Sequence, residues 1–167
     1  LRQKLAMFMI HKTIKLVDSF LENNEKVVII TCYKKELNQL AVYYGDKCVT
    51  FHGGMTQKQR DFAVDMFQNK DDCDKDKKIK VFIGNINAVA TGLNLDASHI
   101  LVFSTFSWDA SLNNQASQRI RRLSQTKDCK IFYQIFENTI NEDMYERVLS
   151  KDNIANTIIK SETEKQI

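Results

Sequence analysis

The sequence predicts an α/β fold: a three-layer sandwich with a mostly parallel sheet and helices on both faces. Short apolar runs rich in β-branched residues recur along the chain, which is the pattern of strands buried on both faces. Segments with helical periodicity separate these runs, and this alternation is typical of parallel sheets. The 167 residues, of which 43% are hydrophobic and 27% charged, suffice for one globular domain with a sizeable core.

The first half of the chain is predicted to form a helix followed by two βα units. Apolar residues at helical spacing predict a helix from about residue 3 to 22. The run VVIIT at 27–31 predicts a strand, followed by a helix over 34–44 and the strand KCVTF at 47–51. After the loop HGG, Thr56 is a predicted N-cap. Gln59 completes a capping box for a helix that ends near Phe67.

The second half continues the alternation. The charged stretch NKDDCDKDKKIK is expected to be a surface loop, and strands are expected at 79–84, 99–104 and 129–136. A helix from about Ser111 to Leu123 should separate the last two strands, and helices near 139–149 and 152–160 should precede the polar tail SETEKQI. Because no internal repeat or domain boundary is visible, we expect a single unit: the helix 3–22, a core over 26–149, and a C-terminal helix and tail over 150–167.

Composition excludes several classes of protein. No run of about 18 apolar residues occurs, and the amphipathic N-terminal segment lacks the features of a signal peptide. The cysteines form no CxxC motif, and the three histidines add no ligand spacing, which argues against a metal site. Three of the four cysteines lie in or beside apolar segments, so we expect buried free thiols in a reducing, intracellular compartment. The cysteines are Cys32, Cys48, Cys73 and Cys129.

Polar loops follow four predicted strands in succession. They contain CYKK, HGG, NINAVATGLN and TFSW, in chain order. Open parallel sheets bind ligands beyond the carboxyl ends of their strands. The sequence therefore predicts one continuous functional edge.

An arginine cluster lies in QASQRIRRLSQ, residues 115–125, although the net charge of the chain is only +3. The chain has no GxxxxGK[ST] motif and no acidic metal-binding box, so it cannot by itself hold a nucleoside triphosphate and its magnesium in the P-loop manner. Arginine stabilises charge on a transferring phosphoryl group and is often supplied by a neighbouring domain. On a helix, Arg119 and Arg122 would share one face. The alternative is a solvated helix face paired with acids.

These segments together resemble the motifs of one ATPase family. QASQRIRRLSQ resembles motif VI of superfamily-two helicases, in the form found in Swi/Snf-type ATPases. AVATGLNLDASHILVFSTFSW resembles motif V with the strand and tryptophan that follow it, and KVVIITCYKKELNQL resembles motif IV. TFHGGMTQKQRDFAVDMFQ resembles the block after motif IV, and the order holds over about 5–149. Among subgroups, the motifs look most like HARP-like annealing helicases and their viral and bacterial relatives.

The resemblance implies the second, C-terminal lobe of two RecA-like lobes. ATP and Mg²⁺ would be bound mainly by an N-terminal lobe of the same polypeptide, which is absent from this chain. Arg119 and Arg122 would act as arginine fingers, and Gln115, Gly92 and Asn94 would lie at the nucleotide. Duplex DNA would be the partner, with no membrane. Its track would include Tyr33, Lys34, His52, Gly53, Asn85, Ile86 and Trp108.

The resulting hypothesis is the motor lobe of an ATP-dependent, nucleic-acid-stimulated DNA translocase. It would be nuclear in a eukaryote and cytoplasmic in a bacterium or virus. As an enzyme it would hydrolyse ATP only together with the other lobe. Two alternatives remain: a lobe of an RNA or single-strand helicase, and a non-hydrolysing nucleic-acid-binding module. A doubly wound small-ligand binder is disfavoured because no GxGxxG motif opens a helix.

Overall fold

A six-stranded sheet forms the centre of the computed structural model, which describes residues 2–68, 79–136, 138–151 and 157–160. The strand order is β2-β3-β1-β4-β5-β6, and every neighbouring pair is parallel. The strands are β1 (Val27–Thr31), β2 (Cys48–Phe51), β3 (Val81–Asn85), β4 (Ile100–Phe103), β5 (Lys130–Ile135) and β6 (Thr157–Lys160).

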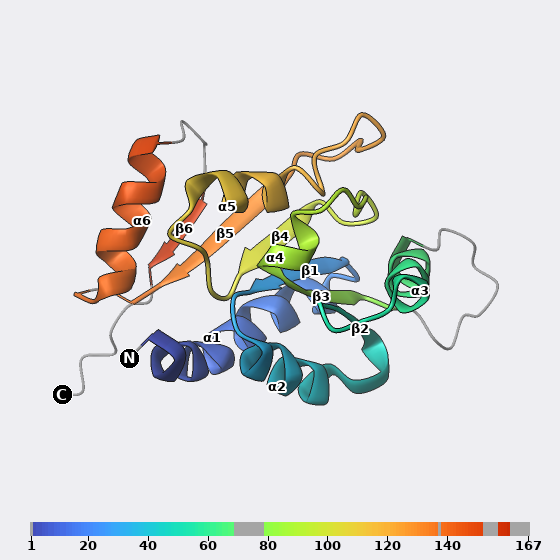
Figure 1. Ribbon diagram of the computed structural model, residues 1–167, viewed down its shortest axis with the longest axis horizontal. Helices are drawn as coiled ribbons and strands as arrows, with labels where there is room; N and C mark the ends of the chain where they lie inside the picture. Colours follow the sequence, from blue (N-terminus) through green and yellow to red (C-terminus); the bar gives the residue numbers. More distant parts are fainter. Residues whose placement is uncertain (1, 69–78, 137, 152–156, 161–167) are drawn as a thin grey trace.

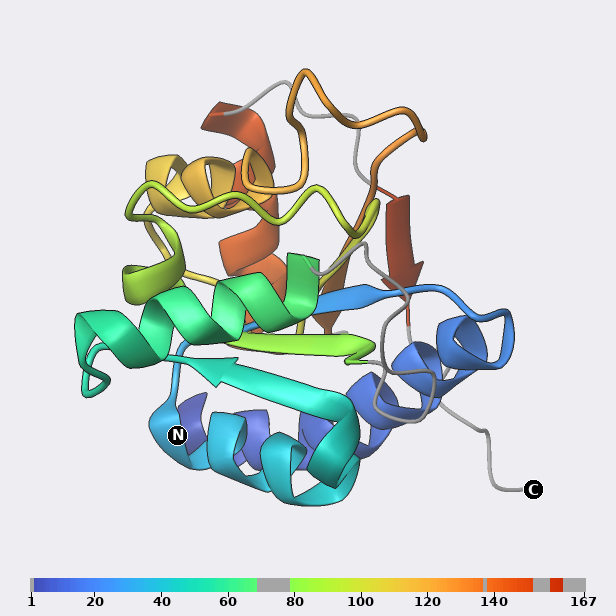
Figure 2. The same ribbon diagram turned by 90° about the vertical axis from the view of Figure 1, so that its right-hand side faces the viewer.

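Helices cover both faces of this sheet, as predicted. Figures 1 and 2 show α1 and α2 on one face and α3 to α6 on the other. The fold is thus a three-layer α/β sandwich. The helices are α1 (Arg2–Glu22), α2 (Lys34–Tyr44), the 3₁₀ turn η1 (Gly45–Lys47), α3 (Gln57–Gln68), α4 (Ile86–Val89), α5 (Ala110–Ser117) and α6 (Ile140–Lys151).

Two apolar clusters, one on each side of the sheet, explain the β-branched runs. Val28 and Ile30 of β1 point into the cluster beneath α3 to α6, whereas Val27 and Ile29 point into the cluster beneath α1 and α2. All four are fully buried. Because consecutive side chains of a strand point to opposite faces, a strand between two helical layers is expected to be apolar at most positions.

The structure corrects the end of one predicted helix and the type of another predicted element. The helix expected over 111–123 ends at Ser117, and the next residues form a turn. The helix expected over 152–160 is replaced at Thr157–Lys160 by a strand that pairs with β5, while 152–156 lie outside the described residues. The predicted surface loop at 69–78 with Cys73, and the tail at 161–167, also lie outside the described residues.

The described cysteines, Cys32, Cys48 and Cys129, are free thiols, and each is half-buried rather than fully buried. In the part of the chain that the structure describes, no helix is long and apolar enough to cross a bilayer. Within the same residues, no three His, Cys, Asp or Glu side chains gather as a metal site would require.

Gly84 in β3 offers a test of this packing. A Cβ at this position would overlap Val89 Cγ2 and lie 3.2 Å from Phe82 Cε1, and both neighbours are fully buried. We expect Gly84→Ala to lower the free energy of unfolding by about 1–3 kcal/mol, because a packed core accommodates added volume poorly. Gly53→Ala is the matched control, since nothing lies within 4 Å of its Cβ. Urea unfolding of both variants checks this; equal midpoints would contradict it.

Candidate functional site

The carboxyl ends of three neighbouring strands are joined at the backbone of one residue, Cys32. Cys32, just after β1, donates its backbone N–H to Thr105 Oγ1 at 2.7 Å. Its carbonyl accepts a hydrogen bond from Asn85 Nδ2 at 3.2 Å. Thr105 follows β4 and Asn85 ends β3. The predicted functional edge is therefore one hydrogen-bonded unit at these three strands.

The HGG turn brings the end of β2 to the same edge. His52 Nδ1 accepts a hydrogen bond from the Gly54 N–H at 3.2 Å, and Arg60 of α3 donates to the Gly53 carbonyl at 3.0 Å. A Cβ built on Gly54 would lie 3.9 Å from Lys34 Nζ, so the turn adjoins the first residue of α2. Partial burial and the charges of Lys34 and Arg60 lower the pKa of His52, which favours a neutral ring at pH 7.

The predicted track residues differ in how much side chain they expose. Tyr33 is the half-buried N-cap residue of α2, and Lys34 beside it is exposed. Trp108, in the loop after β4, is 42% exposed. The Ile86 side chain is only 2% exposed, so any contact that Ile86 makes must come from its main chain. Asn85, beside it, accepts from the Asn87 N–H and caps α4.

The arginine segment, residues 118–125, lies against the loop 90–98. Arg119 Nη2 donates to the Ala90 carbonyl at 2.6 Å, and Arg122 Nη2 donates to the Leu93 carbonyl at 3.1 Å. The Arg119 carbonyl accepts from the Leu95 N–H at 2.9 Å. These contacts explain why α5 ends early: the segment satisfies hydrogen bonds across to another loop rather than along a helix. The expectation that Arg119 and Arg122 share a helix face is therefore wrong.

Gln125 completes this connection and was not predicted as part of the site. Its Nε2 donates to the carbonyls of Asp96 at 3.1 Å and Ser98 at 2.9 Å. Ser124 Oγ also donates to a carboxylate oxygen of Asp96. The pKa of Arg119 is lowered, first by burial and then by the neighbouring charge of Arg122. The two guanidinium groups are thus held close together at one loop.

Two of the three residues predicted at the nucleotide, Gly92 and Asn94, lie together. Gly92, with φ of 62°, and Asn94 lie in the loop that accepts from the two arginines. Both line a polar hollow of about 320 Å³ that Arg60 of α3 also borders. Gln115 is exposed on α5, and its Nε2 donates to Ser111 Oγ at 3.2 Å.

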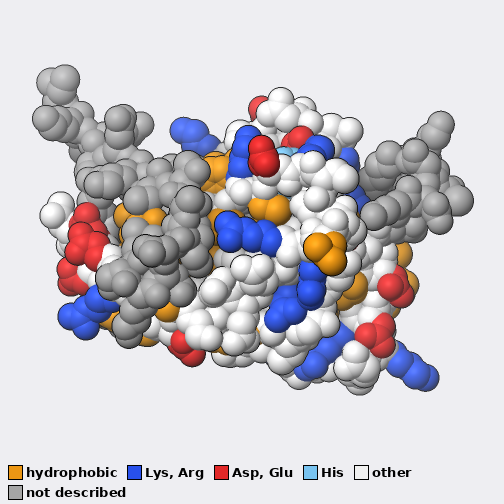
Figure 3. Space-filling model, turned by 90° about the horizontal axis from the view of Figure 1, so that it is seen from above, with side chains coloured by type: hydrophobic (Ala, Val, Ile, Leu, Met, Phe, Trp, Pro, Cys, Tyr) orange, Lys and Arg blue, Asp and Glu red, His pale blue; other side chains and the backbone are white. Residues whose placement is uncertain are grey.

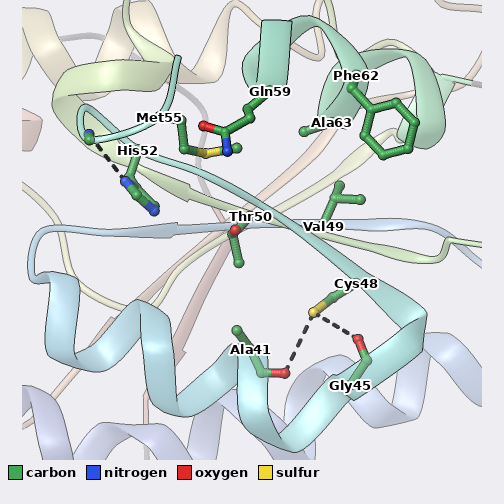
Figure 4. Close-up of a pocket in the computed structure, with 11 residues that line it drawn as sticks. Ala41, Gly45, Cys48, Val49, Thr50, His52, Met55, Gln59, Phe62 and Ala63 are labelled. Atoms are coloured by element: carbon green, nitrogen blue, oxygen red, sulfur yellow. Dashed lines mark hydrogen bonds between the residues drawn. The ribbon is translucent and has the colours of Figure 1, made fainter. Parts of the chain in front are cut away.

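A second hollow, of about 600 Å³, lies between α2, β2 and α3 (Figure 4). Its lining includes no lysine, arginine, aspartate or glutamate. This hollow therefore offers a phosphate group no lysine or arginine side chain. Seen from the side of α4 and α5, several lysine and arginine side chains lie across the middle of the surface (Figure 3).

Glu36 of α2 is a fully buried carboxyl that sequence reasoning missed. Ser104 Oγ donates to Glu36 Oε1 at 2.5 Å, and Thr105 Oγ1 donates to Glu36 Oε2 at 2.7 Å. Burial raises the pKa of Glu36 from 4.5 to about 7, against the opposing effect of these hydrogen bonds and one with the Tyr33 backbone. Its burial could have been predicted from spacing, because Glu36 lies four residues before Leu40 and eight before Tyr44, on the buried face of α2.

Comparisons with known proteins bear on the family and the fold of the chain. The family model "Helicase conserved C-terminal domain" matches residues 10–124. "Helicase swr1" of Schizosaccharomyces pombe is 28% identical over 87% of this chain, and "DNA repair protein rhp54" of the same organism is 28% identical over 83%. These alignments cover 11% and 16% of the two relatives, so the chain spans a small part of their length.

A solved structure, "Crystal structure of the C-terminal part of Fun30 ATPase domain", shares the fold with a TM-score of 0.74. It is 24% identical, and the match covers 84% of this chain and 45% of that one.

The raised pKa of Glu36 predicts a pH-dependent stability. The folded chain binds this proton more tightly than the unfolded chain, because burial raises the carboxyl pKa from 4.5 to about 7. The favourable contribution is therefore complete below pH 4.5 and is lost as the pH rises through 7. Relative to Glu36→Gln, we expect the wild-type free energy of unfolding to fall by roughly 3 kcal/mol between pH 4.5 and 8. Urea unfolding across this range checks the difference; parallel profiles would contradict it.

Proposed function

Because the chain belongs to the helicase conserved C-terminal domain family, in its Swi/Snf-type branch, we propose that it is the C-terminal motor lobe of an ATP-dependent, nucleic-acid-stimulated DNA translocase. The observation that carries the proposal is the arginine segment, which holds Arg119 and Arg122 together on the loop 90–98. The curated relatives are much longer than this chain, so the complete activity would belong to a longer polypeptide.

Arg119 and Arg122 would stabilise charge on the phosphoryl group as water attacks it. A guanidinium has five N–H donors, so a bond to one carbonyl leaves others for phosphate oxygens. The cleft for ATP would lie between the two lobes, and this lobe would contribute Gln115, Gly92 and Asn94 to it. ATP and Mg²⁺ would be held mainly by an N-terminal lobe, because this chain has no P-loop motif.

The strand-end loops would form part of the DNA track. Lys34 offers a cation, and the HGG turn and Asn85 offer main-chain and amide groups of the kind that bind phosphate oxygens. Contacts of this type carry little sequence information and weaken with salt. Trp108 is exposed enough to approach the strand, and Tyr33 precedes Lys34 at the same edge. A DNA partner is supported by the name of one relative, a DNA repair protein, and the duplex form is part of our proposal.

Arginine substitution in the parent polypeptide tests this function. We expect Arg122→Ala and Arg119→Ala to lower DNA-stimulated ATP turnover by about a thousandfold, the effect of losing an arginine finger. Arg121→Ala is the matched control: its charge acts on the Cys129 thiol, and we expect turnover within about threefold of wild type.

Turnover should be measured with duplex DNA, single-stranded DNA, RNA and no nucleic acid. Stimulation by RNA or single strands in place of duplex would favour the other helicase class. Full turnover by both substituted proteins, with folding intact, would contradict the catalytic role of the arginines. Nucleic-acid binding without ATP turnover by the wild-type parent would favour the non-hydrolysing binding module.

The isolated chain should hydrolyse ATP negligibly. It carries the arginines but has no P-loop to hold the triphosphate, so the phosphoryl group would not be positioned for attack. Phosphate release by the purified 167 residues, with and without duplex DNA, measures this directly. Robust turnover that survives removal of contaminating ATPases would contradict the two-lobe assignment.

A further inference from the structure

A buried chain of polar side chains runs behind the strand-end loops, crossing from α2 through the loop after β4 to α1 and β5. Glu36 accepts from Ser104 and Thr105, as described above. Thr13 Oγ1 of α1 lies 2.8 Å from Ser104 Oγ and 2.7 Å from Gln134 Oε1 of β5. All five side chains are buried. Groups buried in this way must satisfy one another, because water does not reach them.

Counting protons fixes the direction of the bond at Thr105. Its hydroxyl carries one proton and lies 2.7 Å from both Glu36 Oε2 and the Cys32 N–H. Since an N–H can only donate, Thr105 must accept from Cys32, and its own proton is free to go to Glu36. Glu36 therefore orients the hydroxyl that holds the Cys32 peptide.

The rest of the chain can adjust to the charge state of Glu36. If Glu36 carries a proton on Oε1, donation runs from Glu36 to Ser104, from Ser104 to Thr13 and from Thr13 to Gln134, and each hydroxyl donates once and accepts once. If Glu36 is ionised, Ser104 donates to it and Thr13 donates to Ser104. The Gln134 amide must then turn to donate in its place. In both states, Oε2 still accepts from Thr105.

Cys32 lies at the centre of the strand-end edge. Its N–H donates to Thr105 in the loop after β4, and its carbonyl accepts from Asn85 at the end of β3. Tyr33 and Lys34 follow it directly and begin α2. These two hydrogen bonds, together with the one between Glu36 and the Tyr33 backbone, help to set the direction of the β1–α2 loop. Glu36 takes part directly in the Tyr33 bond and orients Thr105 for the other.

Stability alone does not require a carboxyl here. Leu37 and Leu40 of the same helix are fully buried, and an apolar side chain at position 36 would fit the pattern of this face. Burying a carboxyl carries a desolvation penalty, and replacing buried charged groups by apolar ones is often neutral or stabilising. A role in placing the loop gives the carboxyl a function that leucine cannot supply.

We propose that Glu36 is a positioning residue for the nucleic-acid track, acting through Thr105 on the Cys32 peptide to hold Tyr33 and Lys34 in their binding geometry. The proposal rests on the proposed function, because the track itself is part of that function. Because Glu36 is fully buried, its side chain would touch neither nucleic acid nor nucleotide. Its effect should therefore appear in the concentration of nucleic acid needed, more than in the maximal rate.

The test compares two pairs of variants in the parent polypeptide. Thr105→Val keeps the shape of threonine but removes the hydroxyl, and Thr105→Ser keeps the hydroxyl. Glu36→Leu removes both acceptors. Glu36→Gln can accept from Thr105 and donate to Ser104, which reproduces the pattern of the protonated acid. The readouts are the duplex DNA concentration that gives half-maximal ATP turnover and the maximal turnover, with circular dichroism to establish folding.

We expect Thr105→Val to raise the half-maximal duplex concentration about tenfold, the effect of leaving one buried N–H without its acceptor. Glu36→Leu should raise it in the same direction, because the Thr105 hydroxyl loses the acceptor that orients it. Maximal turnover should change less, and Thr105→Ser and Glu36→Gln should restore the half-maximal concentration to within about threefold of wild type. If Glu36→Leu does not fold, the comparison of Thr105→Val with Thr105→Ser still tests the proposal.

Three outcomes would count against the proposal, and they are distinguishable. A DNA-stimulated wild type whose half-maximal concentration is unmoved by Thr105→Val would overturn the positioning role alone. A wild-type parent without any nucleic-acid stimulation would overturn the proposed function, and the positioning role with it. Equal losses in both threonine variants would also count against Glu36, because the serine hydroxyl can still receive the Cys32 N–H.

Discussion

Main-chain carbonyls in the irregular loop 90–98 need hydrogen-bond donors, and the arginine segment supplies them. A loop that lacks the regular pairing of helix or sheet must satisfy its peptide groups in other ways. Here the donors are the side chains of Arg119, Arg122 and Gln125. The same bonds that complete the fold also place two guanidinium groups side by side. Structure and candidate chemistry therefore depend on one set of contacts.

Side-chain hydrogen bonds also hold the strand-end loops, but there the side chains are neutral or acidic. The backbone of Cys32 is held by Thr105 at its N–H and by Asn85 at its carbonyl, and Thr105 is in turn oriented by Glu36. No strand in a parallel sheet is joined to its neighbour by a hairpin, so side-chain bonds of this kind are what relate one loop to the next. The edge is consequently a connected surface rather than four independent loops.

Apolar periodicity was enough to predict five of the strands, the helix layers and the capping box of Thr56, which forms with Gln59. These features follow from local spacing and burial. The end of α5 was missed because tertiary bonds to loop 90–98 override a good helical pattern. The strand at 157–160 was missed because TIIK is too short for periodicity to separate strand from helix. Glu36 was missed because its partners are 68 and 69 residues away in sequence.

The strand order has a consequence for biosynthesis. β1 lies at the centre of the sheet, yet both of its neighbours, β3 and β4, are translated after it. At about 5–20 residues per second, a ribosome needs roughly 3–11 seconds to extend the chain from Thr31 to Asn85, the end of the first partner strand. Throughout that interval the apolar run VVIIT has no strand to pair with. Helix α1, made first, packs Ile10 and Val17 in the same cluster as Val27 and Ile29, so it can shield one face of the nascent strand.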